Sequence, residues 1–165
     1  MQEVSVVIPN FNGMAYLDGV LSSLERQTIR NFEVILVDNG STDGSCAFVS
    51  AEYPWVHMIQ LPENYGFSRA VNEGIRAARS PYVLLLNNDT EAEPDFLEEM
   101  VAALRRHKKA FSCQAKMIQL HDRDKMDDAG NYYCALGWAF ARGKGKDIRH
   151  YDREQKIFST CAGAA

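Results

Sequence analysis

The sequence predicts an α/β fold in which a mainly parallel central sheet is covered by helices on both faces. Short apolar runs alternate with helical patterns over the first two thirds of the 165-residue chain. The apolar runs show no polar alternation, which is typical of parallel strands buried on both faces. Right-handed crossovers place the carboxyl ends of such strands at one edge of the sheet, where ligands of open α/β sheets bind. The segments that follow the strands are therefore the candidates for the chemistry.

Each predicted strand is a run of β-branched and aliphatic residues that ends at turn-forming residues. The four strands are expected at residues 4–9, 32–38, 56–62 and 82–87. The first stops at Pro9, and the turn residues Asn10, Asn12 and Gly13 follow it. The second stops at an Asn-Gly pair, which favours a tight turn.

Helical periodicity fills the segments between and after these strands. The apolar positions recur at intervals of three and four residues, which places them on one face of a helix. They are Leu17, Val20, Leu21 and Leu24 for the first helix, Val71, Gly74, Ile75 and Ala78 for the third, and Leu97, Met100, Val101 and Leu104 for the fourth. A shorter second helix is expected at 45–52. Ser68 is expected to cap the third helix, and Pro94 to start the fourth.

The pattern changes near residue 111. Residues 111–120 and the start of 156–165 resemble strands, whereas 121–130 read as a charged loop. Residues 131–152 are rich in aromatic residues and glycine, which indicates an irregular excursion or a hairpin.

Composition disfavours several classes of protein. A net charge of -4 and a pI of about 5.6 argue against a broad nucleic-acid surface. No apolar run approaches the length of a membrane span, and the N-terminus lacks the features of a secretory signal. We therefore expect a cytoplasmic protein, with peripheral attachment at the inner face of the cell membrane as an open alternative. The four cysteines are not spaced like zinc ligands.

The segments after the four strands read PNFNG, DNGSTDG, PENYGFSR and NNDTE, and all are rich in Asn, Asp or Gly. Turn formation and helix capping account for Asp43. They account less well for Asp38, because a carboxylate that ends a buried strand needs a partner. An acceptor at this position can take an N–H from a nucleobase.

Asp89 is the candidate ligand for a divalent cation. Mg²⁺ and Mn²⁺ take oxygen ligands, often one or two carboxylates plus substrate phosphates. A single carboxylate with amide neighbours is too weak to hold such an ion alone, so a diphosphate would supply the other oxygens. The metal would then neutralise the charge of a departing diphosphate. The competing interpretation is a polar loop that leads into a helix.

Arg69 follows the third strand at a helix N-terminus, a position that suits phosphate recognition, although a solvated helix residue is the alternative. These features point to a nucleoside diphosphate ligand. No GxGxxG follows the first strand, and no GxxxxGK[ST] occurs, which disfavours a dinucleotide-dependent dehydrogenase and a P-loop NTPase.

Two segments carry a resemblance to a known family: VSVVIPNFNGMAYLDGVLSSLERQTIRNFEVILVDNGSTDGS and NYGFSRAVNEGIRAARSPYVLLLNNDTEAEPDFLEEM. They resemble family 2 glycosyltransferases with the GT-A fold, a Rossmann-like three-layer sandwich. Within that family the chain is most similar to the rhamnosyltransferase-like group. There NND, residues 87–89, stands where other members have Asp-x-Asp, and DDAG at 127–130 also matches.

The resemblance implies an inverting transfer of a sugar from a nucleoside diphosphate sugar, dTDP-rhamnose or a UDP-sugar, with Mg²⁺ or Mn²⁺ as cofactor. The implied acceptor is a hydroxyl of a glycan or lipid-linked molecule in polysaccharide or cell-surface glycan synthesis. The resemblance implies base and ribose contacts for Pro9, Asn10 and Asn12, and a hydrogen bond to the base for Asp38. It implies a place near the base or diphosphate for Arg69. It also implies ribose and phosphate contacts for Asn87 and Asn88, and metal binding for Asp89. Asn39, Asn64 and Gly66 are further candidates for donor binding. We expect one GT-A domain over residues 1–165, with a donor-binding half at 1–110 and a partial acceptor-side half at 111–165.

The sequence departs from the family pattern in two ways. Asn87 replaces the first Asp of Asp-x-Asp, so metal affinity without the donor is expected to be weak. An inverting transfer also needs a base. In the family this is a carboxylate beyond the small-residue strand, and Asp127, Asp128 and Asp147 come too early to match it. No catalytic residue is identified, and we expect a truncated or natural fragment that does not complete the transfer.

Two other classes of function stay open. A non-catalytic nucleotide-binding or interaction domain would bind nucleotide without needing metal. A nucleotidyltransferase would use a nucleoside triphosphate, but such enzymes usually carry a glycine- and arginine-rich loop after the first strand, and PNFNGMAYL has no Arg or Lys.

Overall fold

A computed structural model describes residues 2–160 of the chain. These residues form two compact units, one extending to Val101 and the other beginning at Ala102. The boundary falls inside the helix α4 (Phe96–Arg106). None of the helices in the described part combines the length and the apolar character that crossing a membrane requires.

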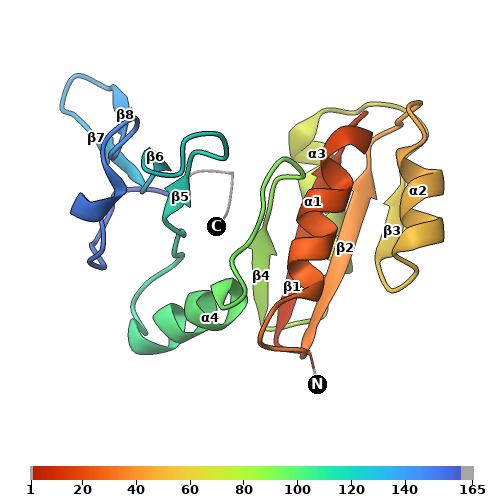
Figure 1. Ribbon diagram of the computed structural model, residues 1–165, viewed down its shortest axis with the longest axis horizontal. Coiled ribbons are helices and arrows are strands. Elements are labelled where there is room, and N and C mark those ends of the chain that lie inside the picture. Colours follow the sequence, from red (N-terminus) through yellow and green to blue (C-terminus); the bar gives the residue numbers. More distant parts are fainter. Residues whose placement is uncertain (1, 161–165) are drawn as a thin grey trace. The chain divides into compact units, whose positions relative to one another are not determined.

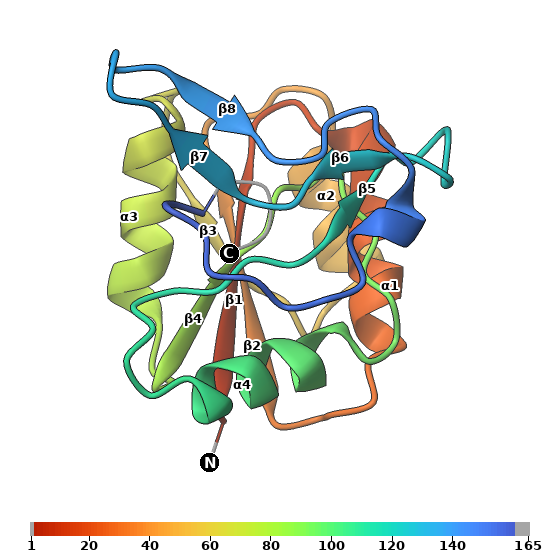
Figure 2. The ribbon, with the colours of Figure 1, turned by 90° about the vertical axis from the view of Figure 1, so that its left-hand side faces the viewer.

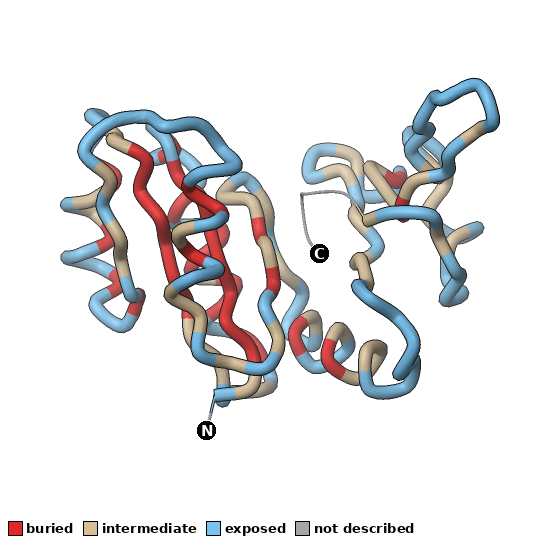
Figure 3. Tube along the Cα trace, turned by 180° about the vertical axis from the view of Figure 1, so that it is seen from behind, coloured by how far each residue is buried: buried red, intermediate tan, exposed pale blue. Residues whose placement is uncertain are grey.

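The first unit is built around a four-stranded parallel sheet of order β3-β2-β1-β4 (Figure 1). The strands are β1 (Val4–Asn10), β2 (Phe32–Asp38), β3 (His57–Gln60) and β4 (Tyr82–Leu85). Every residue of β1 and the last five of β2 are buried, as expected for central strands covered on both faces. Figure 3 shows buried residues concentrated in these strands and the helices beside them.

The outer strands are shorter than predicted. Residues 56–62 and 82–87 were expected to be extended throughout, whereas the regular strands cover four residues each. Within residues 2–160 each outer strand pairs on one side only, so the ladder ends sooner than the apolar run does. Beyond β4 the pairing continues for one residue, because Leu86 N still donates to Val7 O at 3.0 Å.

Helices cover both faces of this sheet, which confirms the predicted α/β architecture. In Figure 2, α1 (Met14–Glu25) and α2 (Ser45–Glu52) lie on one face and α3 (Phe67–Ala77) on the other. The predicted inner face of α1 is fully buried at all four positions, Leu17, Val20, Leu21 and Leu24.

The structure corrects two expectations for α3. Gly66 precedes the helix with φ +86°, and no side chain caps it, so Ser68 lies inside the first turn instead of capping the helix. Ile75 was expected on the inner face but is 41% exposed. A Cβ atom on Gly74 would lie 2.3 Å from Val7 Cγ1, so the helix approaches the sheet most closely at this glycine. The buried stripe therefore runs through Ala70, Val71 and Gly74.

A buried glutamine fixes the start of α4. Gln27 is 1% exposed, and its Nε2 donates to Glu93 O at 2.8 Å and to Ser23 O at 3.2 Å. Its Oε1 accepts from Leu97 N at 2.9 Å. The side chain thus satisfies backbone groups of two helices and of the loop that precedes α4. Leu97 and Val101 are the buried positions of α4, as predicted, whereas Met100 and Leu104 are half-buried.

The second unit consists of short strands. β5 (Met117–Ile118) pairs antiparallel with β6 (Met126–Asp128), and β7 (Asn131–Tyr133) with β8 (Ala139–Ala141), before a short 3₁₀ helix, η1 (Ile148–His150). An irregular excursion or a hairpin was expected within 131–152, and the structure shows a hairpin there, β7–β8. The strand expected at 111–120 shrinks to β5, and 156–160 contribute only a bridge from Ser159 to Asn131; residues 161–165 lie outside the described part. Only Met126 and Gly130 are buried between residues 102 and 160, so little apolar packing supports longer strands.

Candidate functional site

The carboxyl ends of β1 and β2 meet through two buried polar side chains. Asn10 and Asp38 are register partners at the last position of each strand, and both are 2% exposed. Asn10 Nδ2 donates to Asp38 Oδ1 at 2.9 Å, and Ser41 N donates to Asp38 Oδ2 at 2.9 Å. Burial raises the pKa of the Asp38 carboxyl, but hydrogen bonds from Ser41 and Asn10 outweigh it and lower that pKa below its ordinary value. Asp38 is therefore a buried carboxylate whose charge is stabilised by donors.

The same asparagine connects to the segment after β4. Asn10 Oδ1 accepts from Asn88 Nδ2 at 2.8 Å. A Cβ atom on Gly13 would lie 2.1 Å from Asn88 Nδ2 and 2.4 Å from Asn10 Oδ1, so no larger residue fits there without moving this bond. The sequence identified Gly13 only as a turn former. Its role in the packing of two side chains from other segments carries no local signal.

The loops after β1 and β2 are tied together by further hydrogen bonds. Asn12 has a positive φ of 50°, and its Oδ1 accepts from Thr42 N at 2.9 Å. Asp43 accepts from Met14 N at 2.9 Å and from Ser45 N at 3.0 Å, which are the first residues of α1 and α2. Asp43 thus serves the starts of two helices, an extension of the capping role predicted for it. A carboxylate at two helix N-termini is favoured by both helix dipoles.

A second pair of asparagines joins the loops after β2 and β3. Asn39 Nδ2 donates to Asn64 Oδ1 at 2.8 Å, and Asn39 Oδ1 accepts from Tyr65 N at 3.0 Å. Asn64 Oδ1 also accepts from Gly66 N at 2.9 Å. Gly40 makes this approach possible, because its φ is +79° and a Cβ atom there would lie 2.7 Å from backbone atoms of Glu63. The predicted donor-site residues Asn39, Asn64 and Gly66 are therefore brought together.

Asn87 and Asp89 lie on the segment after β4. Asp89 is exposed, whereas Asn87 Oδ1 is buried and has no hydrogen-bond partner among the described residues. Within residues 2–160, no group of three or more His, Cys, Asp and Glu side chains could hold a metal ion. One carboxylate and one unsatisfied amide oxygen suit a hard cation by type but are too few to bind it alone. The donor set fits Mg²⁺ or Mn²⁺ only if a ligand supplies further oxygens.

Two further predicted site residues, Pro9 and Arg69, do not take part in these side-chain hydrogen bonds. Pro9 is buried within β1. Arg69 Nε lies 2.6 Å from Glu73 Oε1, and its guanidinium carbon lies 6.0 Å from the centre of the Tyr65 ring. The positive charge at the start of α3 is thus shared with a carboxylate one turn further along. The Arg69 side chain is 60% exposed and can reorient at a small cost in free energy.

Exposed aromatic rings close to these loops were missed by the sequence reasoning. Phe11, Tyr65 and Phe67 are each about half exposed, at 47%, 49% and 49%. Phe11 directly follows β1, and the other two flank Gly66 at the start of α3. A large aromatic residue inside a polar turn segment was the available signal. Such rings offer flat surfaces on which a base can stack.

Two sets of hydrogen-bonded side chains thus lie at the carboxyl ends of the strands: Asn88, Asn10 and Asp38 in one, and Asn39 and Asn64 in the other. They are linked by the backbone, because Asn39 N donates to Asn10 O at 2.8 Å. The amino-acid sequence matches Glycosyl transferase family 2 over residues 5–165. The chain belongs to this family. The resemblance inferred from its motifs is confirmed at the level of the family.

Two curated relatives show how much of a family 2 glycosyltransferase the chain represents. Glycosyltransferase GlyG of Streptococcus pneumoniae is 29% identical over 133 residues, which are 79% of this chain and 42% of GlyG. Validoxylamine A glucosyltransferase of Streptomyces hygroscopicus is 34% identical over 105 residues, which are 61% of this chain and 25% of that enzyme. The chain therefore spans less than half the length of these two relatives.

Solved glycosyltransferase structures share the fold. S. aureus TarS 1-349 has been solved with UDP and with UDP-GlcNAc; the latter superposes with a TM-score of 0.60 and 27% identity, covering 65% of this chain and 32% of TarS. The mannosyltransferase PcManGT from Pyrobaculum calidifontis, solved with GDP-Man and Mn²⁺, has a TM-score of 0.55 over 71% of this chain and 35% of its own. Its identity is 22%, so that likeness concerns the fold alone. The predicted GT-A fold, with its mainly parallel sheet between helices, is confirmed.

Proposed function

We propose that this glycosyltransferase domain binds a nucleoside diphosphate sugar at the edge formed by Asn10, Asp38, Asn39, Asn64 and Asn88. The enzyme would transfer the sugar to an acceptor hydroxyl with inversion of its anomeric configuration, in polysaccharide or cell-surface glycan synthesis. The observation that carries the proposal is the pair of side-chain hydrogen-bond networks along the carboxyl ends of the parallel strands. Asn88, Asn10 and Asp38 form one network and Asn39 and Asn64 the other. The backbone bond from Asn39 N to Asn10 O, 2.8 Å long, joins them. Ligands of open α/β sheets bind at this edge.

The nucleoside would lie against the loops after β1, β2 and β3. Both oxygens of Asp38 already accept protein hydrogen bonds, but a carboxylate oxygen can accept a second one. Because Asp38 is 2% exposed, a base would have to enter between the surrounding loops to donate an N–H to it. The exposed rings of Phe11 and Tyr65 would add stacking surfaces. The UDP and UDP-GlcNAc complexes of TarS favour a UDP-sugar. The NND and DDAG motifs favour dTDP-rhamnose as the alternative donor.

Asp89 and Asn87 would hold Mg²⁺ or Mn²⁺ together with the donor diphosphate. The metal would supply positive charge that stabilises the departing diphosphate. Asn87 Oδ1 is a buried acceptor without a partner in the described residues, which is unfavourable unless a ligand satisfies it. Asn88 is held by Asn10, so its backbone can keep the two flanking side chains in place. Arg69 would leave Glu73 to meet the base or the phosphates.

Nucleotide binding to the full chain tests this proposal. UDP, dTDP and GDP are compared by thermal shift with and without Mn²⁺. A ligand at one hundred times its dissociation constant should stabilise the fold by about 2.7 kcal/mol. We expect the response to one nucleoside diphosphate to need the metal and to disappear in Asp89→Asn.

The matched control is Asp95→Asn, which removes the same charge from a neighbouring exposed position. It should leave the response intact. Metal-independent binding that survives Asp89→Asn would favour a non-catalytic nucleotide-binding domain. A response to nucleoside triphosphates alone would favour a nucleotidyltransferase.

A further inference from the structure

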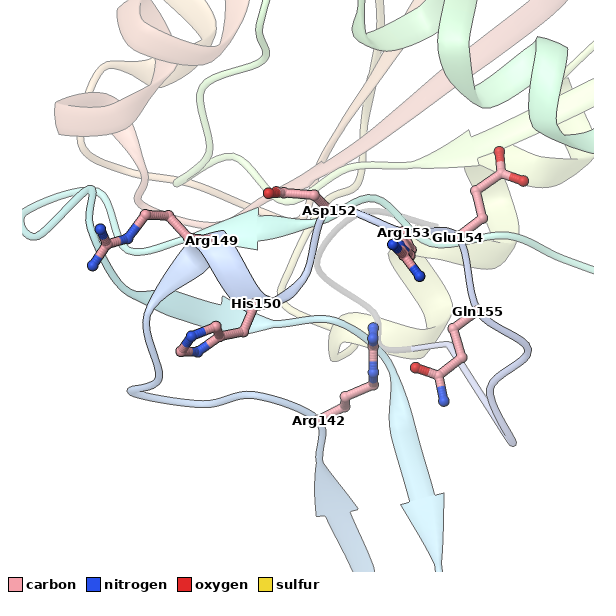
Figure 4. Close-up of a pocket in the computed structure, with 7 residues that line it drawn as sticks. All are labelled: Arg142, Arg149, His150, Asp152, Arg153, Glu154 and Gln155. Carbon is pink, nitrogen blue, oxygen red and sulfur yellow. The ribbon is translucent and has the colours of Figure 1, made fainter.

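The second unit contains an open pocket of about 570 Å³ (Figure 4). It is lined by Arg142 and by residues 149, 150 and 152–155. Two of these are carboxylates, Asp152 and Glu154, which would repel an anion if they faced the pocket unpaired. Figure 4 shows both directed away from Arg142 and Gln155.

Both carboxylates are neutralised by residues that do not line the pocket. Asp152 Oδ1 lies 2.6 Å from Lys116 Nζ. Glu154 pairs with Arg106, and its Oε2 lies 2.9 Å from His107 Nε2. Hydrogen bonds from His107 and Arg106 lower the pKa of Glu154. The negative charges of the lining are therefore compensated from outside.

Arg142 is held in place on the pocket wall. Its Nη1 donates to Ala129 O at 3.3 Å, and its guanidinium carbon lies 5.0 Å from the centre of the Tyr151 ring. A Cβ atom on Gly143 would lie 2.8 Å from that ring, so glycine lets Tyr151 reach its position. One N–H is used by the carbonyl, and most of the guanidinium donors stay available. No carboxylate pairs with Arg142 in the described part of the chain.

Arg153 supplies a second uncompensated positive charge. Across residues 2–160 it forms no hydrogen bond or ion pair, although it lines the same pocket. Arg149 differs, because its Nη2 lies 2.6 Å from Asp147 Oδ2, and the pair is locally neutral. Gln155 donates through Nε2 to the Tyr132 hydroxyl at 3.1 Å and keeps its other amide hydrogen. The pocket therefore carries two guanidinium groups that have no carboxylate partner within residues 2–160, and an oriented amide.

We propose that Arg142 and Arg153 form a binding site for a phosphate group. Guanidinium groups match phosphate oxygens through paired hydrogen bonds, and two positive charges balance a phosphate monoester, which carries about -1.5 to -2 at neutral pH. The ligand is either a soluble phosphate compound or a phosphorylated lipid. The site uses residues of the second unit only and does not depend on the proposed donor site.

Titration calorimetry of the full chain with inorganic phosphate and pyrophosphate, without divalent metal, tests the proposal. We expect saturable binding that weakens about tenfold or more in Arg153→Gln and in Arg142→Gln, since each loses charge-assisted hydrogen bonds. Arg153 has no partner to lose in the described structure, so its variant keeps the proposal testable if Arg142→Gln fails to fold.

Lys144→Gln is the charge-matched control. Lys144 is 67% exposed, lies 3.5 Å from Asp127 and does not line the pocket. Its variant should bind phosphate within about twofold of the original, as expected for a weak surface pair. Asp89→Asn should also keep phosphate binding, so failure of this proposal is distinguishable from failure of the donor-site proposal.

Vesicles separate the two sources of phosphate. Co-sedimentation compares phosphatidylcholine vesicles with and without phosphatidic acid, whose headgroup is a phosphate monoester. Binding to phosphatidic acid that Arg153→Gln abolishes assigns a lipid phosphate. Binding of inorganic phosphate without vesicle binding assigns a soluble compound. The proposal is overturned if none of these probes binds, or if Lys144→Gln weakens binding as much as Arg153→Gln does.

Discussion

Asn10 Nδ2 lies 2.9 Å from Asp38 Oδ1, in a hydrogen bond that joins the ends of the two central strands beneath the surface of the site. Residues 10 and 38 are separated by a complete strand–helix–strand crossover, and the parallel register alone makes them neighbours. The bond therefore depends on correct formation of the sheet, and the loops on both sides depend on the bond.

Asp38→Asn should lower the stability of the fold at neutral pH by roughly 1.5–3 kcal/mol, the cost of losing hydrogen bonds to a charged group. The folded pKa of Asp38 lies below its ordinary value of 3.8. Its stabilising contribution is thus fully present above that pH and is lost as the pH falls through the lower folded value. Urea unfolding at a series of pH values should show the difference between the two proteins shrinking in acid. A difference that stays constant below pH 3.8 would contradict this.

Gly13→Ala should weaken nucleotide binding, because the new methyl group occupies the space of the Asn10–Asn88 hydrogen bond. Gly19→Ala is the matched control within α1, since its Cβ atom would meet nothing closer than 3.5 Å. That control should be neutral or stabilising by roughly 0.5–1 kcal/mol, the usual gain of Ala over Gly in a helix. Calorimetric titration with the preferred nucleotide compares the affinities of the two variants, and thermal unfolding measures the stability of Gly19→Ala. Unchanged affinity in Gly13→Ala would show that this bond does not position the site.

Gly40→Ala should destabilise the fold more than Gly44→Ala does. Both glycines have a positive φ, +79° and +91°, so both changes carry backbone strain of about 1 kcal/mol or more. Only the first also brings a Cβ atom to within 2.7 Å of the Glu63 backbone, whereas Gly44 has open space. Thermal unfolding of the two variants side by side measures the cost of the close approach. Equal losses would mean that the Glu63 segment moves aside freely.

Gln27→Ala should destabilise the first unit by roughly 1–3 kcal/mol for each backbone group left buried without a partner. The backbone groups that would lose their hydrogen bond to Gln27 are Glu93 O and Leu97 N, at the start of α4. Gln60→Ala is the control, since Gln60 is exposed and its side chain donates to Met58 Sδ at the long distance of 3.9 Å. Amide hydrogen exchange measures the effect at Leu97, whose protection should fall in the variant. Protection of Leu97 equal to that of the original protein would refute the anchoring role.

The central part of the fold was predictable because its elements are set by local apolar patterns that the packing then respects. Val4–Asn10 and the helix with Leu17 and Leu24 agree with the sequence. A strand buried on both faces leaves an uninterrupted apolar run, and a helix with one buried face leaves an apolar periodicity. Ile75 was placed wrongly because helical spacing does not reveal that Gly74 brings α3 against Val7. The second unit was predicted least well, since Met126 and Gly130 are its only buried residues among 102–160, and little periodicity results.

The place of the candidate residues at the sheet edge was predictable, but the hydrogen-bond partner of each side chain was not. Parallel topology places the ends of all four strands together, so Asn10, Asp38 and Asn88 were expected near one another. Which nitrogen faces which oxygen depends on atoms brought together from distant segments. The pairing of Arg69 with Glu73 follows helical spacing, so the sequence alone predicts it.

The hydrogen bonds of Asn10 have a direction, and Asp38 sets it. A carboxylate only accepts, so the amide of Asn10 must turn its NH₂ toward Asp38 and its oxygen toward Asn88. Asn88 must then turn its own NH₂ inward, which leaves its Oδ1 as the atom available to an incoming molecule. The negative charge of Asp38 at the end of β2 thus acts through Asn10 on Asn88. It determines that the segment after β4 presents a hydrogen-bond acceptor to a ligand. An amide in place of Asp38 would remove that constraint and allow both asparagines to flip, changing the kind of chemical group that the edge recognises.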